Sequence, residues 1–240
     1  MSDLLDMALE AHGGMDMWRQ LTRITVHKTI GGTLWKLKRQ DHNIADNILR
    51  VDPRRPHSVY SPTALPNLNL VFDGDRQVSV ETYDGQVLEY RPAPRAAVQD
   101  MERDHPWDLL HLTYFAGYAG WNYLTTPFIF TYPGFSVGEI EPWDEDGETW
   151  RRLRVEFSQD IPTHSPVQTF YFDAAGLLRR LDYTADVVGG FPTAHYLYDH
   201  QNFSGLVMPT RRKAFFRQPD GRPRPEPISV ELGYSDFKLD

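Results

Sequence analysis

Apolar and polar residues alternate along most of the chain, in short runs that end at turn residues. The runs are rich in β-branched and aromatic residues, and a period of two is typical of strands with one buried face. Turn sequences separate the runs at Asp73-Gly74, Asp84-Gly85, Asp146-Gly147, 173–176 and Asp220-Gly221. Because such turns join neighbouring antiparallel strands, the pattern predicts a sheet built from consecutive hairpins.

The strand pattern is clearest after residue 150. It predicts six strands there, at 150–157, 167–172, 177–184, 194–200, 206–216 and 228–237. A Gly31-Gly32 pair inside the alternating segment 23–40 predicts one more hairpin. The sequence has no strand–helix–strand alternation and no glycine-rich phosphate loop, which argues against a nucleotide-binding doubly wound fold. The expected fold class is mainly β with a few helices.

Two segments have helical spacing instead. Residues 2–21 predict an N-terminal helix with Ser2 as its N-cap and a break at Gly13-Gly14; its apolar face consists of Leu4, Leu5, Ala8 and Leu9. Residues 107–124, between Pro106 and Pro127, predict a helix with one aromatic face. That face consists of Trp107, His111, Tyr114, Tyr118 and Trp121. The small residues Ala116, Gly117, Ala119 and Gly120 leave a flat patch, so we expect this helix to lie on the sheet.

The amino-acid composition argues against several functions and excludes sites that need cysteine. The 240 residues carry 25 Lys and Arg against 33 Asp and Glu, a net charge of −8, which argues against binding to nucleic acid. With 40% hydrophobic residues and no repeat or long linker, we expect residues 1–240 to form a single domain. The sequence has no cysteine, so disulfides, thiolate metal sites and cysteine nucleophiles are excluded.

The sequence also gives expectations for the cellular location of the protein and for metals and cofactors. The first residues are acidic rather than basic, and no apolar run approaches the ~18 residues of a membrane span. The sequence thus predicts a cytoplasmic protein without a membrane span. His195 and His200 are the closest pair of histidines, but residues five apart on a strand point to opposite faces. We therefore expect no metal site, and no motif implies a cofactor.

Several short segments resemble the lipoprotein-localisation superfamily. They are Ala11-His12-Gly13-Gly14 followed by Trp18, and then 170–173, 176–178, 181–183 and 203–209. The resemblance implies one strongly curved antiparallel sheet, a half-barrel, with an apolar concave face that helices partly close. The lipoprotein carriers of this superfamily are exported or have an N-terminal cysteine, so this chain would be a cytoplasmic branch of it. A violacein-pathway enzyme of similar fold works without metal or cofactor, so the architecture also admits catalysis.

Four residues are candidates for acid–base chemistry. Asp182 and His195 fall on consecutive predicted strands, where antiparallel pairing would bring carboxylate and imidazole together as a general base. His164, in the loop before the 167–172 strand, and Tyr196 could reach the same end of the sheet. The alternative is that His164, Asp182, His195 and Tyr196 are solvated residues of a sheet face.

The aromatic helix either fills the core or forms one wall of an apolar pocket. In the second case Trp107, His111, Tyr114, Tyr118 and Trp121 would contact a ligand. Arg211, in a basic run after Pro209, could hold a carboxylate or enolate of that ligand, or protect an edge strand. The leading interpretation is a protein that binds a small hydrophobic or aromatic molecule between the curved sheet and the helix. The alternative is a cofactor-independent cyclase, isomerase or lyase that uses the same pocket.

Overall fold

The computed structural model describes residues 3–99 and 101–240, and the fourteen strands in these ranges form one antiparallel sheet. The first six strands are β1 (Ile24–Gly31), β2 (Asp46–Asp52), β3 (His57–Pro62), β4 (Leu68–Asp73), β5 (Gln77–Thr82) and β6 (Val87–Pro92). The others are β7 (Ser136–Glu145), β8 (Glu148–Glu156), β9 (Val167–Phe172), β10 (Leu178–Ala185), β11 (Phe191–Phe203), β12 (Leu206–Arg217), β13 (Pro223–Arg224) and β14 (Val230–Leu239).

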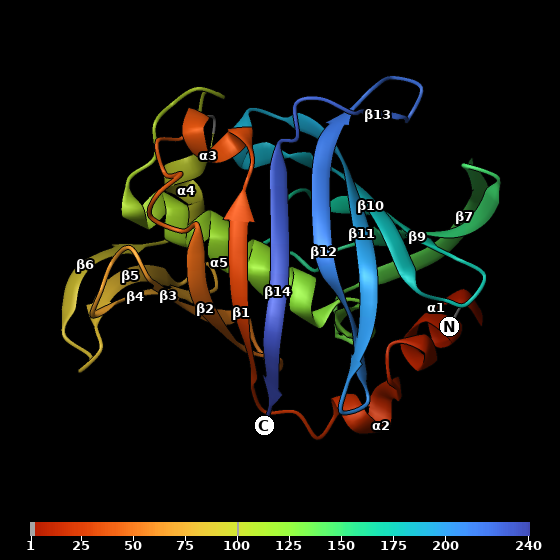
Figure 1. Cartoon of the computed structure of the whole chain (residues 1–240), viewed down its shortest axis with the longest axis horizontal. Helices are drawn as coiled ribbons and strands as arrows, with labels where there is room; N and C mark the ends of the chain where they lie inside the picture. Colours follow the sequence, from red (N-terminus) through yellow and green to blue (C-terminus); the bar gives the residue numbers. More distant parts are fainter. Residues whose placement is uncertain (1–2, 100) are drawn as a thin grey trace.

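The strand order places the first strand, β1, and the last strand, β14, side by side at the centre of the sheet. The order is β6-β5-β4-β3-β2-β1-β14-β12-β11-β10-β9-β8-β7, with the short β13 paired to β12. The chain leaves the centre with β1, reaches one edge at β6, re-enters at the other edge with β7 and returns to the centre with β14. Figure 1 shows β1 and β14 side by side, in orange and dark blue.

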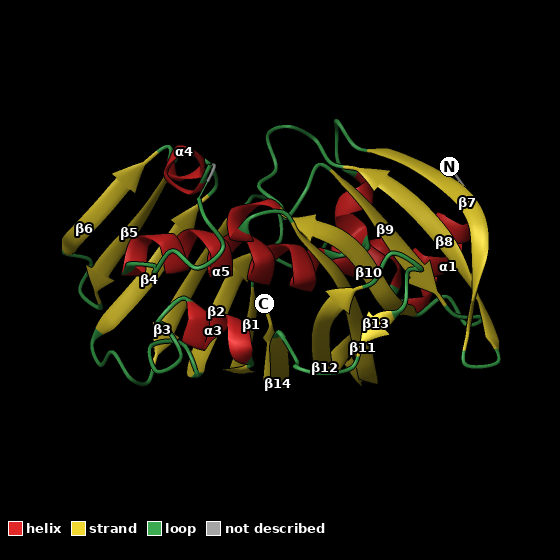
Figure 2. Ribbon diagram, turned by 90° about the horizontal axis from the view of Figure 1, so that it is seen from above, coloured by secondary structure: helices red, strands yellow, loops and turns green. Residues whose placement is uncertain are grey.

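The predicted fold class is confirmed. The sheet is open, and Figure 2 shows it curved around helix α5 (Leu109–Thr125), which lies on the concave face. Each of the six strands predicted after residue 150 is present, with ends within three residues of the predicted ones. The alternation and the turn residues between the runs were sufficient to locate these strands, although β10 and the first half of β11 are buried on both faces.

The hairpin predicted at Gly31-Gly32 is wrong. β1 ends at Gly31, and the short helix α3 (Thr33–Leu37) follows. Gly32 has a φ of +112°, and a Cβ atom there would lie 2.4 Å from the carbonyl oxygen of Ser229. The glycine is therefore needed because the chain leaves the sheet in close contact with another stretch of backbone.

The N-terminal segment forms two short helices, α1 (Asp3–Ala11) and α2 (Gly14–Trp18). The predicted break is confirmed: Gly13 has a φ of +121°, and a Cβ there would lie 2.2 Å from the carbonyl oxygen of Gly205. Ser2, the predicted N-cap, lies outside the described residues. The apolar face predicted for this segment is buried, so α1 packs into the main core.

Helix α5 begins at Leu109, two residues after the predicted start, and Asp108 is its N-cap. The short helix α4 (Pro94–Val98) precedes it. The Asp108 carboxylate accepts a hydrogen bond from the amide of His111 at 2.7 Å. A Cβ at Gly117 would lie 2.3 Å from Cβ of Phe72, and one at Gly120 would lie 2.2 Å from the hydroxyl of Tyr60. The predicted close packing on the sheet is thus confirmed. Across the described ranges, no helix is long and apolar enough to cross a membrane.

Candidate functional site

The central strands present polar side chains to the concave face, where an apolar lining was expected. Five residues form what we call the polar band: Lys28 on β1, Tyr234 on β14, Arg212 on β12, His195 on β11 and Tyr183 on β10. The strand register places Lys28 opposite Tyr234, and His195 opposite Ala214, two residues beyond Arg212. Every member of the polar band is less than a tenth exposed. Burial of polar groups costs free energy unless each finds a partner, so the partners decide what this band can do.

The two cations of the polar band have few partners. The Lys28 ammonium donates to the hydroxyl of Tyr60 at 3.0 Å. Arg212 donates through Nη2 to the carbonyl oxygen of Tyr123 at 2.9 Å, and its guanidinium lies 4.7 Å from the centre of the Tyr123 ring. Neither cation forms an ion pair with a carboxylate of the described residues. Desolvation lowers the pKa of Lys28 to about 7 and also lowers the pKa of Arg212.

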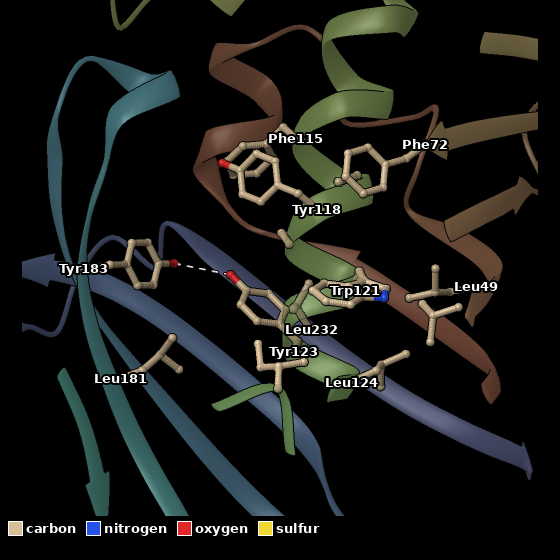
Figure 3. Close-up of a cluster of buried hydrophobic side chains, with 14 of the residues drawn as sticks. Leu49, Phe72, Phe115, Tyr118, Trp121, Tyr123, Leu124, Leu181, Tyr183 and Leu232 are labelled. Carbon is tan, nitrogen blue, oxygen red and sulfur yellow. Dashed lines mark hydrogen bonds between the residues drawn. The ribbon is translucent and has the colours of Figure 1, made fainter. Parts of the chain in front are cut away.

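A chain of hydrogen bonds links α5 to the polar band. His164, in the loop before β9, lies 3.2 Å from the hydroxyl of Tyr118 through Nδ1 and 2.7 Å from that of Tyr123 through Nε2. The Tyr123 hydroxyl lies 3.4 Å from that of Tyr183, as Figure 3 shows, and Tyr183 in turn lies 3.3 Å from Nδ1 of His195. Desolvation lowers the pKa of His164 to about 3 and that of His195 well below its ordinary value. Both imidazoles are therefore neutral near pH 7.

Several buried polar atoms beside this chain have no hydrogen-bond partner among the described residues. They are Nε2 of His195, Nε of Arg212, the hydroxyl of Tyr234 and Oδ1 of Asn47, which is opposite Lys28 in the ladder. Unpartnered buried groups are uncommon in folded proteins. They lie on neighbouring strands, so the unfilled hydrogen-bonding capacity of the concave face is concentrated at this place.

Two cavities flank α5. One, of about 440 Å³, lies between α3 and strands β10 to β12, and its lining includes Leu34, Phe115, Tyr183, Phe191 and Ala214. The other, of about 750 Å³, is lined by α4, by Tyr114 on α5, by loop 157–166, and by the short 3-10 helix η2 (Asp186–Val188) with the residues after it. The smaller cavity shares Tyr183 with the polar band, so an apolar space and a polar surface meet there.

Comparison with known proteins identifies the fold. No protein-family model and no curated protein matches the sequence. The structure is similar to the LolA superfamily protein NE2245 from Nitrosomonas europaea, with 13% identity, 99% of this chain and 92% of that chain covered, and a TM-score of 0.54. It is also similar to a "putative outer membrane lipoprotein-sorting protein domain" from Vibrio parahaemolyticus, with 8% identity, 98% of this chain and 92% of that chain covered, and a TM-score of 0.54. A third similar structure is a DUF1329 family protein from Desulfovibrio piger ATCC 29098, with 10% identity, 99% of this chain and 92% of that chain covered, and a TM-score of 0.52.

The chain has a LolA-like fold. The resemblance recognised in the sequence is therefore confirmed at the level of the fold. At identities this low the likeness concerns the arrangement of the backbone and does not carry over a ligand or a site residue.

The LolA-like sheet separates the four acid–base candidates into two pairs. The predicted contact between Asp182 and His195 is wrong, because the ladder pairs Asp182 with Ala194 and His195 with Leu181. Residues that are one register position apart point to opposite faces. His195 lies on the concave face with His164, to which it is linked through two tyrosines.

Asp182 and Tyr196 lie on the convex face, around Arg180. Arg180 is fully buried and donates to Asp182 Oδ1 at 2.7 Å, to the hydroxyl of Tyr196 at 2.9 Å and to Glu145 Oε2 at 3.0 Å. A guanidinium with two carboxylates and a hydroxyl around it has its hydrogen-bonding capacity largely filled. This cluster stabilises the outer layer and leaves no free group for a ligand.

The predicted ligand residues are also divided. Tyr118 and Trp121 are buried in the core under α5, where Trp121 Nε1 donates to the carbonyl oxygen of Asp52 at 2.7 Å. Tyr114 lines the 750 Å³ cavity. Trp107 precedes the helix and packs on Phe115, with ring centres 4.9 Å apart.

His111 caps the N-terminus of α5 and does not face the polar band. Its carboxylate partner, Asp108, is held in turn by Arg91 at 2.7 Å.

Arg211 points away from the concave face, contrary to the expectation that it could meet a ligand there. It donates to Asp199 at 2.9 Å on the convex face, whereas Arg212 faces inward. Sequence reasoning also missed Lys28 and Tyr123. The alternation along β12 was a usable signal for Arg212. The alternation along β1 was one for Lys28, which shares a face with the buried Val26 and Ile30.

Proposed function

We propose that the protein binds a small hydrophobic or aromatic molecule in the 440 Å³ cavity between α5 and the curved sheet. The cavity itself supports this proposal most directly. Its size falls in the range of small-molecule sites, and apolar side chains from α3, α5 and β11 contribute to its lining. Leu37, at the α3 side of the cavity, is 37% exposed, so an apolar surface lies open to an incoming molecule.

The fold is consistent with such a role. One solved protein with the same fold is described as a lipoprotein-sorting domain, and lipoproteins carry apolar acyl chains. A half-barrel with an apolar cavity on its concave face can bind an apolar chain of this kind. The cytoplasmic location expected from the sequence remains a prediction, as does the absence of a cofactor.

A binding measurement with a neutral fluorescent probe tests the proposal. N-phenyl-1-naphthylamine should bind with one-to-one stoichiometry and a fluorescence increase. Leu37→Glu should weaken this binding about fivefold, because a carboxylate replaces apolar surface worth roughly 1 kcal/mol at the cavity. Leu88→Glu is the matched control, since Leu88 is 50% exposed on β6 and does not line the cavity. Absence of saturable binding, or an equal loss in both variants, would show that the cavity is not a binding site.

A cofactor-independent enzyme is the second candidate. The chain from His164 through Tyr123 and Tyr183 to His195 favours it, because such a chain can move a proton. It ranks second because an imidazole with a pKa of about 3 is a weak base near neutral pH. If the protein is a cyclase, isomerase or lyase, a molecule captured from its host should gain deuterium from heavy water on the wild-type protein and not on His195→Ala. No deuterium on the wild type rejects this candidate.

A further inference from the structure

We propose that the bound molecule is an amphipathic carboxylic acid, whose carboxylate pairs with Arg212 and Lys28 of the polar band while its apolar tail fills the 440 Å³ cavity. This inference rests on the proposed function, because it assumes that the cavity takes an apolar ligand. It assigns the chemical class of the ligand and the residues that hold its polar end.

The two cations of the polar band lack a counter-ion. Arg212 and Lys28 are each 2% exposed, and no carboxylate of the described chain pairs with either. The Arg212 guanidinium stays charged at neutral pH, and a buried charge without a partner is costly, so natural proteins pair such charges. This chain does so elsewhere: Arg180, equally buried on the convex face, has both Asp182 and Glu145 as partners. The contrast indicates that an anion from outside the chain completes the concave site.

Several hydrogen-bond donors beside these cations are unused. Nε of Arg212, the hydroxyl of Tyr234 and Nε2 of His195 have no partner in the described part of the chain. Where the Tyr183 hydroxyl donates to Nδ1 of His195, the neutral ring carries its proton on Nε2 and becomes a donor. A carboxylate only accepts hydrogen bonds, and its two oxygens can accept about four of them. It therefore matches a cluster in which donors predominate.

Residues next to these donors in the sheet line the cavity. Ala214 and Tyr183 belong to the cavity lining. Ala214 is opposite His195 in the ladder and two residues from Arg212 on the same face of β12, a spacing of about 7 Å. The tail and the head of one molecule can therefore occupy adjoining places. The charged residues of the lining, Lys36 and Arg103, are both cationic, which favours an anion over a cation.

The experiment compares two probes that differ only in the head group, decanoate and decan-1-ol. Each displaces N-phenyl-1-naphthylamine from the wild-type protein and from the variants. The wild type should bind decanoate at least tenfold more tightly than decan-1-ol, and Arg212→Met should reduce this preference to less than threefold. Arg211→Met, one residue away on the convex face, is the matched control and should keep the full preference. Lys28→Met should keep part of it.

Each other outcome overturns a defined part of the argument. Equal binding of the acid and the alcohol by the wild type refutes the carboxylate site but leaves the hydrophobic cavity in place. A preference that survives Arg212→Met and disappears in Lys36→Met places the carboxylate at the cavity mouth, and refutes the assignment to Arg212. Failure of decanoate, decan-1-ol and the fluorescent probe to bind refutes the proposed function as well. If near-ultraviolet circular dichroism shows that Arg212→Met does not fold, the preference for decanoate over decan-1-ol is measured in Arg212→Gln and Lys28→Met instead.

Discussion

Replacing Lys28 by methionine should remove a pH dependence of stability that the wild-type protein has above neutral pH. Lys28 is buried on the concave face, and its ammonium donates one hydrogen bond, to Tyr60. Desolvation, with a smaller repulsion from Arg212, lowers the pKa of Lys28 from 10.5 to about 7. The unfolded chain keeps the ordinary value. From pH 7 to 10.5 the unfolded state therefore binds more protons, and the free energy of unfolding rises with pH.

The expected rise can be estimated from this difference in pKa. One proton of difference between the two states changes the free energy of unfolding by about 1.4 kcal/mol per pH unit. Because folded Lys28 has already lost most of its proton at pH ~7.5, the rise from there to pH ~9 is about 2 kcal/mol for this group. Lys38 acts in the same direction, since burial lowers its pKa to about 8. Lys28→Met should lose only the part that comes from Lys28.

Urea unfolding followed by tryptophan fluorescence measures the free energy at both pH values. Lys238→Met is the matched control, because Lys238 is an exposed lysine on β14, the strand beside β1. Wild type and Lys238→Met should gain about 2 kcal/mol more than Lys28→Met on going to the higher pH. Equal gains in all three proteins would refute the conclusion that the Lys28 ammonium is desolvated in the fold.

Three further predictions concern packing and charge. Gly120→Ala should lower the free energy of unfolding by about 1–3 kcal/mol in urea titrations, because its Cβ would overlap the Tyr60 hydroxyl, whereas Gly138→Ala, with open space around it, should not. Arg180→Met should destabilise the protein by about 3–5 kcal/mol in the same assay, because it removes the guanidinium that bridges the buried carboxylates of Asp182 and Glu145. A loss below about 1 kcal/mol would contradict this. Acid should destabilise the wild type below about pH 6.5, because the unfolded chain protonates histidines that burial keeps neutral in the fold. In thermal unfolding, His164→Phe should reduce this dependence of stability on pH, and an unchanged pH profile would contradict the prediction.

The elements of the fold were predictable because their signals are local. Alternation and turn residues identify the strands after residue 150, and the 3.6-residue spacing identifies α5. The helix after Gly32 was missed because its five residues are too few to show a period, and the adjacent glycines favour a hairpin when only neighbours are considered.

The candidate site was predictable only in part. His164 and His195 were named from the sequence and do lie on one face, but the chain of hydrogen bonds between them passes through Tyr123 and Tyr183. Those tyrosines come from α5 and β10, which are far apart in the sequence, so no spacing rule connects them. Alternation along β1 does place Lys28 on the apolar face with Val26 and Ile30, but it does not show that this lysine lies beside Arg212.

The sequence by itself determined which segments are strands and helices, and therefore that the protein is mainly β. Only the tertiary structure decided which side of each strand faces inward. Arg211 and Arg212 must point to opposite faces on any strand, but the pairing of β12 with β11 and β14 is what turns Arg212 toward α5. The same pairing separates Asp182 from His195. A shift of one residue in register reverses every side chain of a strand, and register depends on contacts between distant segments.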